Sequence, residues 1–197
     1  EIIQQRKINI EWMCESRVDI VDEELLHKMK KAGNSAIYFG IESGTQRVLD
    51  LLNKGFKLAQ TIKAIKLCKK YDIKVIASIM LGIPGQSKEE NYETIRFIKK
   101  LSPDVVYFNP FIGIPGSKLY DYIIEKGLTY KKIGDIILSN SEVYSWPEKI
   151  QLKQKAELLY NLSPKIFLRH LKRIGFKRIF KKGVITINRL WQLDNGI

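Results

Sequence analysis

Cysteine and histidine are scarce in this sequence, and each scarcity excludes a class of site. The 197 residues contain two cysteines, Cys14 and Cys68, and two histidines. Two cysteines exclude a disulfide scaffold and fit a reducing compartment, so we expect a cytoplasmic protein. They cannot supply the three thiolates that an iron–sulfur cluster needs, and no His/Cys group has metal-ligand spacing. We therefore assign no metal ligand to any residue of this chain.

Several other signals are absent as well. No stretch approaches the 18 apolar residues of a transmembrane helix, and neither a P-loop nor a Gly-x-Gly-x-x-Gly turn occurs. Basic and aromatic residues are not interleaved in the way that is typical of RNA-binding modules, so nucleic acid is not an expected partner. What remains is an apolar content of 45% and a charged content of 28%, typical of a soluble globular domain.

The net charge of +13 is concentrated near the C-terminus. From Lys149 to Arg189 there are twelve basic residues and one acidic residue, Glu157, which gives +11 and leaves +2 for the rest of the chain. Lysine and arginine alternate with leucine, isoleucine and phenylalanine in the later part of this tail. That pattern fits a membrane surface, an acidic partner or an ordinary solvated helix face.

Strand-like and helix-like segments alternate along most of the chain. Between the strand-like runs lie helical patterns, the first of which begins at Asp22 and has Leu25, Met29 and Ala32 as its apolar stripe. Such alternation predicts an α/β fold with a parallel sheet and outer helices, either half a (β/α) barrel or a curved open sheet. The predicted strands are 8–13, 36–41, 74–81 and 104–108.

The region after these units follows a different pattern. Residues 129–147 have an irregular, polar-aromatic composition, and we expect no regular element there. A long amphipathic helix is predicted from about 148 to 160, broken at Pro164 and resumed over 166–174.

One turn stands out for its position. The apolar run 76–81 stops at Gly82-Ile83-Pro84-Gly85, and a capping box formed by Ser87 and Glu90 starts a helix immediately afterwards. A glycine turn between a strand and a helix exposes backbone N–H groups at the carboxyl edge of the sheet. That edge is where parallel α/β folds bind ligands.

A second strand–turn–helix segment lies upstream, over residues 36–55. Its turn is Glu42-Ser43-Gly44, and Arg47 follows Ser43 by four residues on the next helix. A serine hydroxyl at a strand end and a guanidinium one helical turn later can together hold a carboxylate, because arginine offers two parallel donors.

These two segments, in this order and at this distance, resemble the second half of a radical SAM (S-adenosylmethionine) barrel. The resemblance covers roughly residues 8–128 and implies a partial TIM-like barrel, with residues 129–197 as a basic, mainly helical extension. It implies SAM as a cofactor and a [4Fe–4S] cluster, and reductive cleavage of SAM to a 5′-deoxyadenosyl radical, which requires an electron donor. The run 148–174 is similar to the tail of cobalamin-binding members, so cobalamin is a further candidate cofactor.

The resemblance also assigns roles to individual residues. It implies that Ser43 and Arg47 hold the SAM carboxylate and that Glu42 contacts the amine or ribose. Arg17, at the end of the first strand, is assigned to SAM as well, with an ion pair to Asp19 or Asp22 as the alternative. The residues assigned to the adenosine side are Gly82, Pro84, Gly85 and Asn109.

One departure from the family pattern matters as much as the match. The CxxxCxxC motif that anchors the cluster is absent, so we expect a fragment whose cluster ligands lie in missing N-terminal βα units and which is inactive alone. The alternative is a cluster-free α/β binding or scaffold module without catalytic activity. A TIM-like enzyme of phosphate chemistry is disfavoured, because no third glycine turn supplies a phosphate cup. Catalytic residues and the substrate, small or macromolecular, stay open.

Overall fold

The computed structural model describes residues 2–174. The chain divides into two compact units, one ending at Lys153 and the other beginning at Gln154. This division reflects how compactly the chain packs and does not test where the barrel portion ends. The boundary predicted at 128 between the barrel portion and its extension therefore stays a prediction. None of the helices in the described residues is long and apolar enough to cross a membrane.

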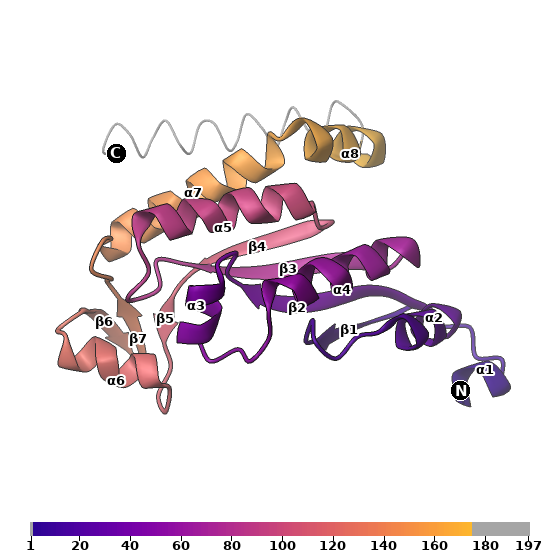
Figure 1. The fold of residues 1–197 in the computed structure, drawn as a ribbon, viewed down its shortest axis with the longest axis horizontal. Coiled ribbons are helices and arrows are strands. Elements are labelled where there is room, and N and C mark those ends of the chain that lie inside the picture. The colour runs from indigo at the N-terminus through magenta and orange to yellow at the C-terminus, as the bar shows by residue number, and fades with distance from the viewer. Residues whose placement is uncertain (1, 175–197) are drawn as a thin grey trace. The chain divides into compact units, whose positions relative to one another are not determined.

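A four-stranded parallel sheet is the centre of the first unit (Figure 1). Its strands lie in chain order, each hydrogen-bonded to the next, and pairs such as Ile37 with Val75 and Ile76 with Val105 fix their register. All carboxyl ends therefore meet at one edge, which confirms the predicted parallel α/β architecture. The strands are β1 (Trp12–Ser16), β2 (Asn34–Glu42), β3 (Lys74–Leu81) and β4 (Val105–Pro110).

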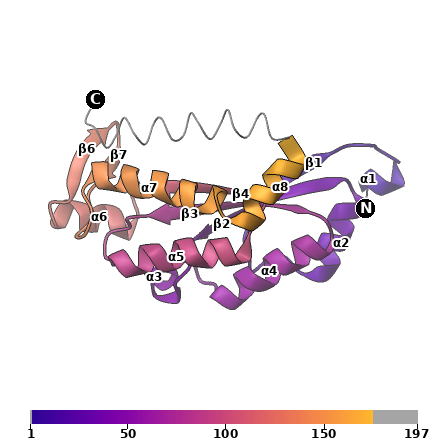
Figure 2. The ribbon, with the colours of Figure 1, turned by 90° about the horizontal axis from the view of Figure 1, so that it is seen from above.

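Helices cover one face of this sheet (Figure 2). The predicted helix starts are confirmed, because Asp22 accepts a hydrogen bond from the Leu25 amide at 2.8 Å and Ser87 forms a reciprocal capping box with Glu90. The covering helices are α2 (Glu23–Lys31), α4 (Leu58–Lys70) and α5 (Lys88–Leu101). Two short helices complete this part, α1 (Ile2–Gln5) near the N-terminus and α3 (Gln46–Leu51) after β2.

Two details differ from the sequence prediction. Strand β1 begins at Trp12 instead of residue 8, because pairing with β2 starts only there and Ile8 and Ile10 are exposed. In α2 the fully buried residue is Leu26, whereas Leu25 is 38% exposed. The helix has only nine residues and a single buried one, Leu26, so the face that carries Leu26 is the face that packs on the core.

The core lies between the sheet and its helices. Alternate residues of the central strands are buried on the helix side, and each such side chain contributes roughly 1.5–3 kcal/mol by leaving water. The buried side chains therefore fix the strand ends, and with them the starting points of the loops that follow. The buried strand residues on this side include Ile37, Phe39, Ile41, Val75, Ala77, Ile79, Leu81 and Phe108.

The opposite face of the sheet is more open. Met13 and Tyr107 are more than half exposed, and the rings of Tyr38 and Tyr107 stack with centroids 6.3 Å apart. An apolar but accessible face of this kind is expected for the inner wall of a partial barrel.

A small antiparallel sheet lies at the carboxyl edge of the parallel sheet (Figure 1). The prediction that residues 129–147 are irregular is wrong, because two strands there pair with each other around Gly134, whose φ is 58°. Every side chain in the first of these strands is exposed. The strand therefore has no alternation of apolar and polar residues by which the sequence could predict it. The elements are β5 (Ile112–Gly113), α6 (Lys118–Glu125), β6 (Thr129–Ile133) and β7 (Ile136–Ser139).

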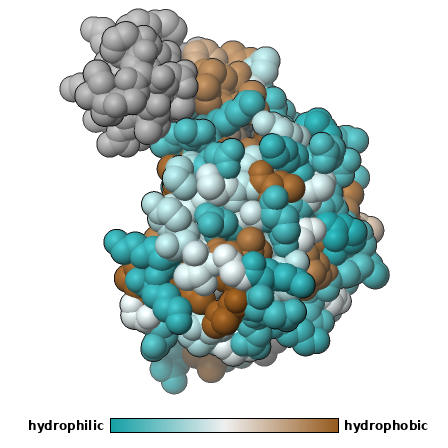
Figure 3. All heavy atoms as spheres, turned by 90° about the vertical axis from the view of Figure 1, so that its left-hand side faces the viewer, coloured by the Kyte–Doolittle hydropathy of each residue, from teal (hydrophilic) through white to brown (hydrophobic). Residues whose placement is uncertain are grey.

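This end of the first unit has a mostly hydrophilic surface (Figure 3). Hydrophobic residues form small separate groups there, and Ile114, Ile124 and Ile133 are each about half exposed. Apolar spots of this size are ordinary for a protein surface.

The C-terminal part is helical in the described residues. Helix α7 (Trp146–Asn161) starts in the first unit and ends in the second, and α8 (Pro164–Ile174) follows. Pro164 is the first residue of α8, a position where the missing N–H has no helical partner to lose. The predicted helix, break and second helix are confirmed, and the basic stretch after 174 lies outside the described residues.

Candidate functional site

The Gly82–Gly85 turn follows β3 at the carboxyl edge. Gly82 and Gly85 have φ of 65° and 79°, backbone conformations that favour glycine. The Gly82 amide donates to Asn91 Oδ1 at 2.8 Å, which ties the turn to α5. Gly82, Ile83 and Pro84 are buried, and Gly85 is exposed. Of the three turn residues assigned to the adenosine, only Gly85 therefore reaches the surface.

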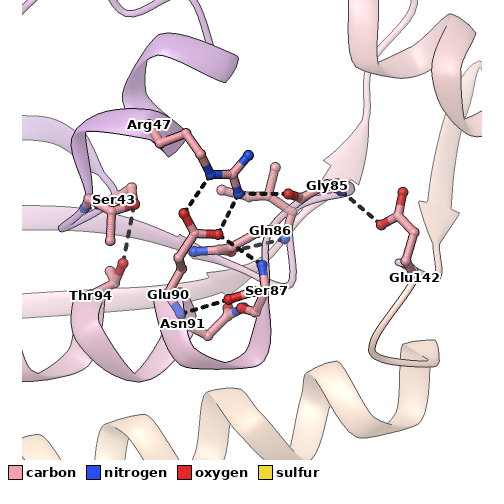
Figure 4. A network of polar contacts seen from close by, with 11 residues as sticks. Ser43, Arg47, Gly85, Gln86, Ser87, Glu90, Asn91, Thr94 and Glu142 are labelled. Atoms are coloured by element: carbon pink, nitrogen blue, oxygen red, sulfur yellow. Dashed lines mark hydrogen bonds and ion pairs between the residues drawn. The ribbon is translucent and has the colours of Figure 1, made fainter.

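Arg47 links α3 to this turn (Figure 4). Its Nε donates to Glu90 Oε1 at 2.7 Å, and its Nη2 donates to Glu90 Oε2 and, at 2.8 Å, to the Gly85 carbonyl. The hydrogen bond raises the pKa of Arg47 and lowers that of Glu90, so both stay charged. Two of the three guanidinium nitrogens of Arg47, Nε and Nη2, already donate hydrogen bonds. A ligand carboxylate would therefore bind at Nη1 or compete with Glu90.

The Ser43 side chain points toward Thr94 on α5 (Figure 4). It is fully buried, and its hydroxyl shares a hydrogen bond of 3.1 Å with the Thr94 hydroxyl on α5. The neighbouring Gly44 amide donates to the same Thr94 oxygen at 3.0 Å. In this arrangement Ser43 fastens the end of β2 to α5. Carboxylate capture by Ser43 together with Arg47 stays a prediction, and it requires the hydroxyl to leave Thr94.

A hollow of about 440 Å³ opens at the carboxyl ends of β2, β3 and β4. Glu42 reaches it because a bulge near the end of β2 and a positive φ of 64° turn that residue, whose carboxylate also pairs with Lys54 at 3.1 Å. The Asn109 amide is 3.5 Å from the Ser78 hydroxyl. The hollow is lined by Glu42, Ser78, Met80, Asn109, Pro110 and Ile112.

Arg17 forms one of its two predicted alternatives, the ion pair with Asp19. Its Nε and Nη2 donate to the two carboxylate oxygens at 3.0 and 2.9 Å, and Nη2 also donates to the Lys54 carbonyl at 2.7 Å. The hydrogen bond to Asp19 raises the pKa of Arg17. A role for Arg17 toward SAM stays a prediction.

The turn also has contacts on the side opposite Arg47. The Gly85 amide donates to Glu142 Oε2 at 2.8 Å, and the Tyr122 hydroxyl donates to Glu142 Oε1 at 2.7 Å. Partial loss of water around this exposed carboxylate raises the pKa of Glu142, but the hydrogen bonds from Gly85 and Tyr122 outweigh it, so the pKa is lowered overall. The carboxylate is therefore charged where it meets the turn.

Lys149, near the start of α7, is fully buried beside Gly82. A Cβ on Gly82 would lie 2.8–2.9 Å from three carbons of the Lys149 side chain. The amine donates to the Ser139 hydroxyl at 3.3 Å, and burial lowers its pKa to about 7 despite the opposing charge of Glu142. The space that glycine leaves at position 82 is thus filled by a lysine stem in this structure.

Sequence reasoning placed Glu42 and Asn109 at the correct edge and missed their neighbours in the hollow. Ser78 and Met80 could have been found, because they alternate with buried Ala77 and Ile79 and so face the same side as Asn109. Glu142 and Lys149 had no signal in the sequence, since they reach the turn from elements that follow the barrel-like units.

The residues present do not fit an iron–sulfur cluster. Cys14 is half-buried and Cys68 fully buried, and burial raises the pKa of the Cys68 thiol to about 12. Within residues 2–174 no group of three His, Cys, Asp or Glu side chains could hold a metal ion. With two cysteines in the whole sequence, this chain does not supply the three thiolates.

The residues at the carboxyl edge do fit part of SAM. The hollow has the size of a small-molecule site and combines one carboxylate, one amide and one hydroxyl with apolar walls. The Glu42 carboxylate suits an amine or ribose hydroxyls, and Met80 and Ile112 suit the faces of an adenine ring. The fold is thus a parallel α/β domain with a hollow of mixed polar and apolar lining at its strand ends.

Comparison with known proteins identifies the family. A family model described as the radical SAM superfamily matches residues 1–98. An uncharacterized methyltransferase of Pyrococcus horikoshii is 31% identical over 195 residues, which cover 96% of this chain and 42% of that protein. The chain belongs to the radical SAM superfamily, whose members are enzymes, and it spans less than half the length of this relative.

Solved structures share the fold. An archaeal Elp3 from Methanocaldococcus infernus superposes with a TM-score of 0.61 at 26% identity, covering 79% of this chain and 34% of that one. The radical SAM methyltransferase TsrM from Kitasatospora setae, with cobalamin and a [4Fe–4S] cluster bound, gives a TM-score of 0.57 at 17% identity, over 68% and 26% of the two chains. The predicted partial barrel is confirmed by these likenesses. The family implies SAM and a [4Fe–4S] cluster as cofactors.

Proposed function

We propose that this chain is the SAM-holding part of a radical SAM enzyme and that the cluster ligands belong to other residues of the whole protein. The observation that supports this most directly is the carboxyl edge of the parallel sheet. There a hollow is lined by Glu42 and Asn109, and the Gly82–Gly85 turn follows β3 at the same edge. The family resemblance assigns all three features to SAM. The span of 42% of the Pyrococcus relative leaves room for the ligands in the whole protein.

When bound, SAM would supply the family's chemistry, reductive cleavage of its C–S bond, with the electron delivered through a cluster that this chain's residues do not hold. This chain's residues bind and orient. The Glu42 carboxylate accepts hydrogen bonds from the amine or ribose, and the Asn109 amide donates and accepts at the adenosine. Arg47 holds the turn and presents Nη1 toward a carboxylate. The apolar walls at Met80 and Ile112 keep water from the adenine faces.

The remaining parts of the function are proposals of smaller scope. The electron comes from an external one-electron donor, and the basic tail contacts an acidic partner or a membrane surface. Use of cobalamin stays a prediction, because the likeness to TsrM is one of fold alone. The P. horikoshii relative is named a methyltransferase, which makes methyl transfer the first reaction outcome to test.

The experiment uses the full-length protein, reconstituted anaerobically with iron and sulfide. SAM binding is measured for the wild type and for Glu42→Gln and Asn109→Ala. Loss of one hydrogen bond costs roughly 1 kcal/mol, so each variant should bind SAM about five- to tenfold more weakly with unchanged iron content. Glu11→Gln is the matched control, because Glu11 lines a separate hollow at the opposite, amino-terminal edge.

Two results would contradict the proposal. If the reconstituted wild type binds no SAM, the cluster-free binding or scaffold module becomes the better account. If Glu42→Gln and Asn109→Ala bind SAM as tightly as Glu11→Gln does, the hollow is not the SAM site.

A further inference from the structure

The segment after β4 contacts the Gly82–Gly85 turn at three of its four residues. Gly82 packs against the Lys149 stem, Ile83 is buried in an apolar cluster, and the Gly85 amide donates to Glu142. This segment, residues 111–153, therefore holds the turn together with α3 and α5. The buried members of the apolar cluster are Val48, Ile83, Phe111, Ile123 and Ile137.

The Gly85 peptide region is held from both sides (Figure 4). Its N–H donates to Glu142 at 2.8 Å, and its carbonyl accepts from Arg47 Nη2 at 2.8 Å. Arg47 is fixed in turn by Glu90 and Glu142 by Tyr122. A continuous chain of polar contacts thus runs from α6 through one glycine to α5.

Gly85 is the one residue of the turn that reaches the surface, and the family resemblance assigns it to SAM. Its φ of 79° is a conformation that favours glycine, and its amide and carbonyl are both held by side-chain hydrogen bonds. Glu142 itself is exposed and adds little to the core. Its two hydrogen bonds therefore serve the direction of the turn more than the stability of the unit.

We propose that Glu142 is a positioning residue of the SAM site and fixes the Gly82–Gly85 turn through the Gly85 amide. This inference rests on the proposed function, and it assigns part of the site to the segment that follows the barrel strands. Tyr122 acts one step further out, because its hydroxyl fixes the second Glu142 oxygen.

The test compares SAM dissociation constants of full-length, anaerobically reconstituted variants, with iron counted in parallel. Glu142→Ala removes the acceptor of the Gly85 amide and should weaken SAM binding three- to tenfold. Glu142→Gln keeps an acceptor of the same length and should restore binding to within twofold of the wild type. Glu125→Ala is the matched control, because this exposed α6 carboxylate pairs with Lys126 and should leave binding unchanged.

The outcomes separate this inference from the proposed function. A wild type that binds no SAM refutes the proposed function and this inference with it. A wild type that binds SAM, with Glu142→Ala binding equally well, refutes the inference alone. If Glu142→Ala loses its far-ultraviolet circular dichroism, Tyr122→Phe decides instead, because it removes only the hydroxyl on Glu142. A two- to fivefold loss then supports the inference, and an unchanged dissociation constant overturns it.

Discussion

Replacing Lys149 by methionine should change the pH dependence of stability in a defined direction. Burial lowers the pKa of this amine from 10.5 to about 7 in the folded chain. Between these two values the unfolded chain binds a proton at this site that the folded chain does not hold. Stability contributed by the site therefore rises with pH across the window, and below pH 7 the folded state carries the full cost of a buried charge.

The magnitude follows from the size of the window. One proton of difference corresponds to about 1.4 kcal/mol per pH unit, so the wild type should gain about 2–3 kcal/mol between pH 7 and pH 9 relative to a variant without the amine. Methionine keeps a flexible apolar stem beside Gly82 and removes the charge. Lys149→Met should therefore exceed the wild type in stability most at pH 6, and this advantage should shrink steadily above pH 7.

Denaturant unfolding of the full chain at pH 6, 7, 8 and 9, followed by circular dichroism, measures this difference. Lys118→Met serves as the control, because Lys118 is an exposed lysine on α6. Its difference from the wild type should not depend on pH. A Lys149→Met difference that is equally flat, or that grows with pH, would refute the reasoning that the amine is buried and poorly solvated.

Three further variants test other contacts. Gly82→Ala should lower the free energy of unfolding by about 1–3 kcal/mol, because its Cβ would meet the Lys149 stem and φ is positive; an unchanged denaturation midpoint would show that Lys149 does not pack there. Ser43→Ala should cost about 1–2 kcal/mol through the buried Thr94 hydroxyl, and a variant of wild-type stability would place the Ser43 hydroxyl elsewhere. Arg47→Ala should weaken SAM binding about ten- to a hundredfold at constant iron content, whereas equal affinity would leave Arg47 a purely structural link.

The sequence was sufficient for the parallel sheet and for the edge at which the candidate site lies. Apolar runs, the Ser87 capping box and the two glycine-containing turns are local signals. The structure forms the strands, the helix start and the turns where these signals lie. Partners of individual side chains were not predictable in this way. Ser43 bonds to Thr94 and Gly82 packs on Lys149, residues that follow them by 51 and 67 positions, and no local pattern reports such contacts.

The small antiparallel sheet is a case in which a whole strand could not be predicted from the sequence pattern. Residues 129–133 form a strand with every side chain exposed, so burial imposed no alternation that the sequence could display. For Arg17 the sequence left two alternatives open, a contact with SAM and an ion pair with a nearby aspartate. The structure forms the ion pair with Asp19, supported by a hydrogen bond to the Lys54 carbonyl. Lys54 lies in a different loop, so this contact could not be predicted from the local sequence.

Formation of 5′-deoxyadenosine tests the central claim most directly. The full-length protein, reconstituted anaerobically, is incubated with SAM and a strong one-electron reductant, and the nucleoside products are separated and quantified. We predict reductant-dependent 5′-deoxyadenosine together with methionine, and a lower yield for Asn109→Ala at the same iron content and subsaturating SAM. A protein that contains a full cluster complement yet forms no 5′-deoxyadenosine would contradict the account.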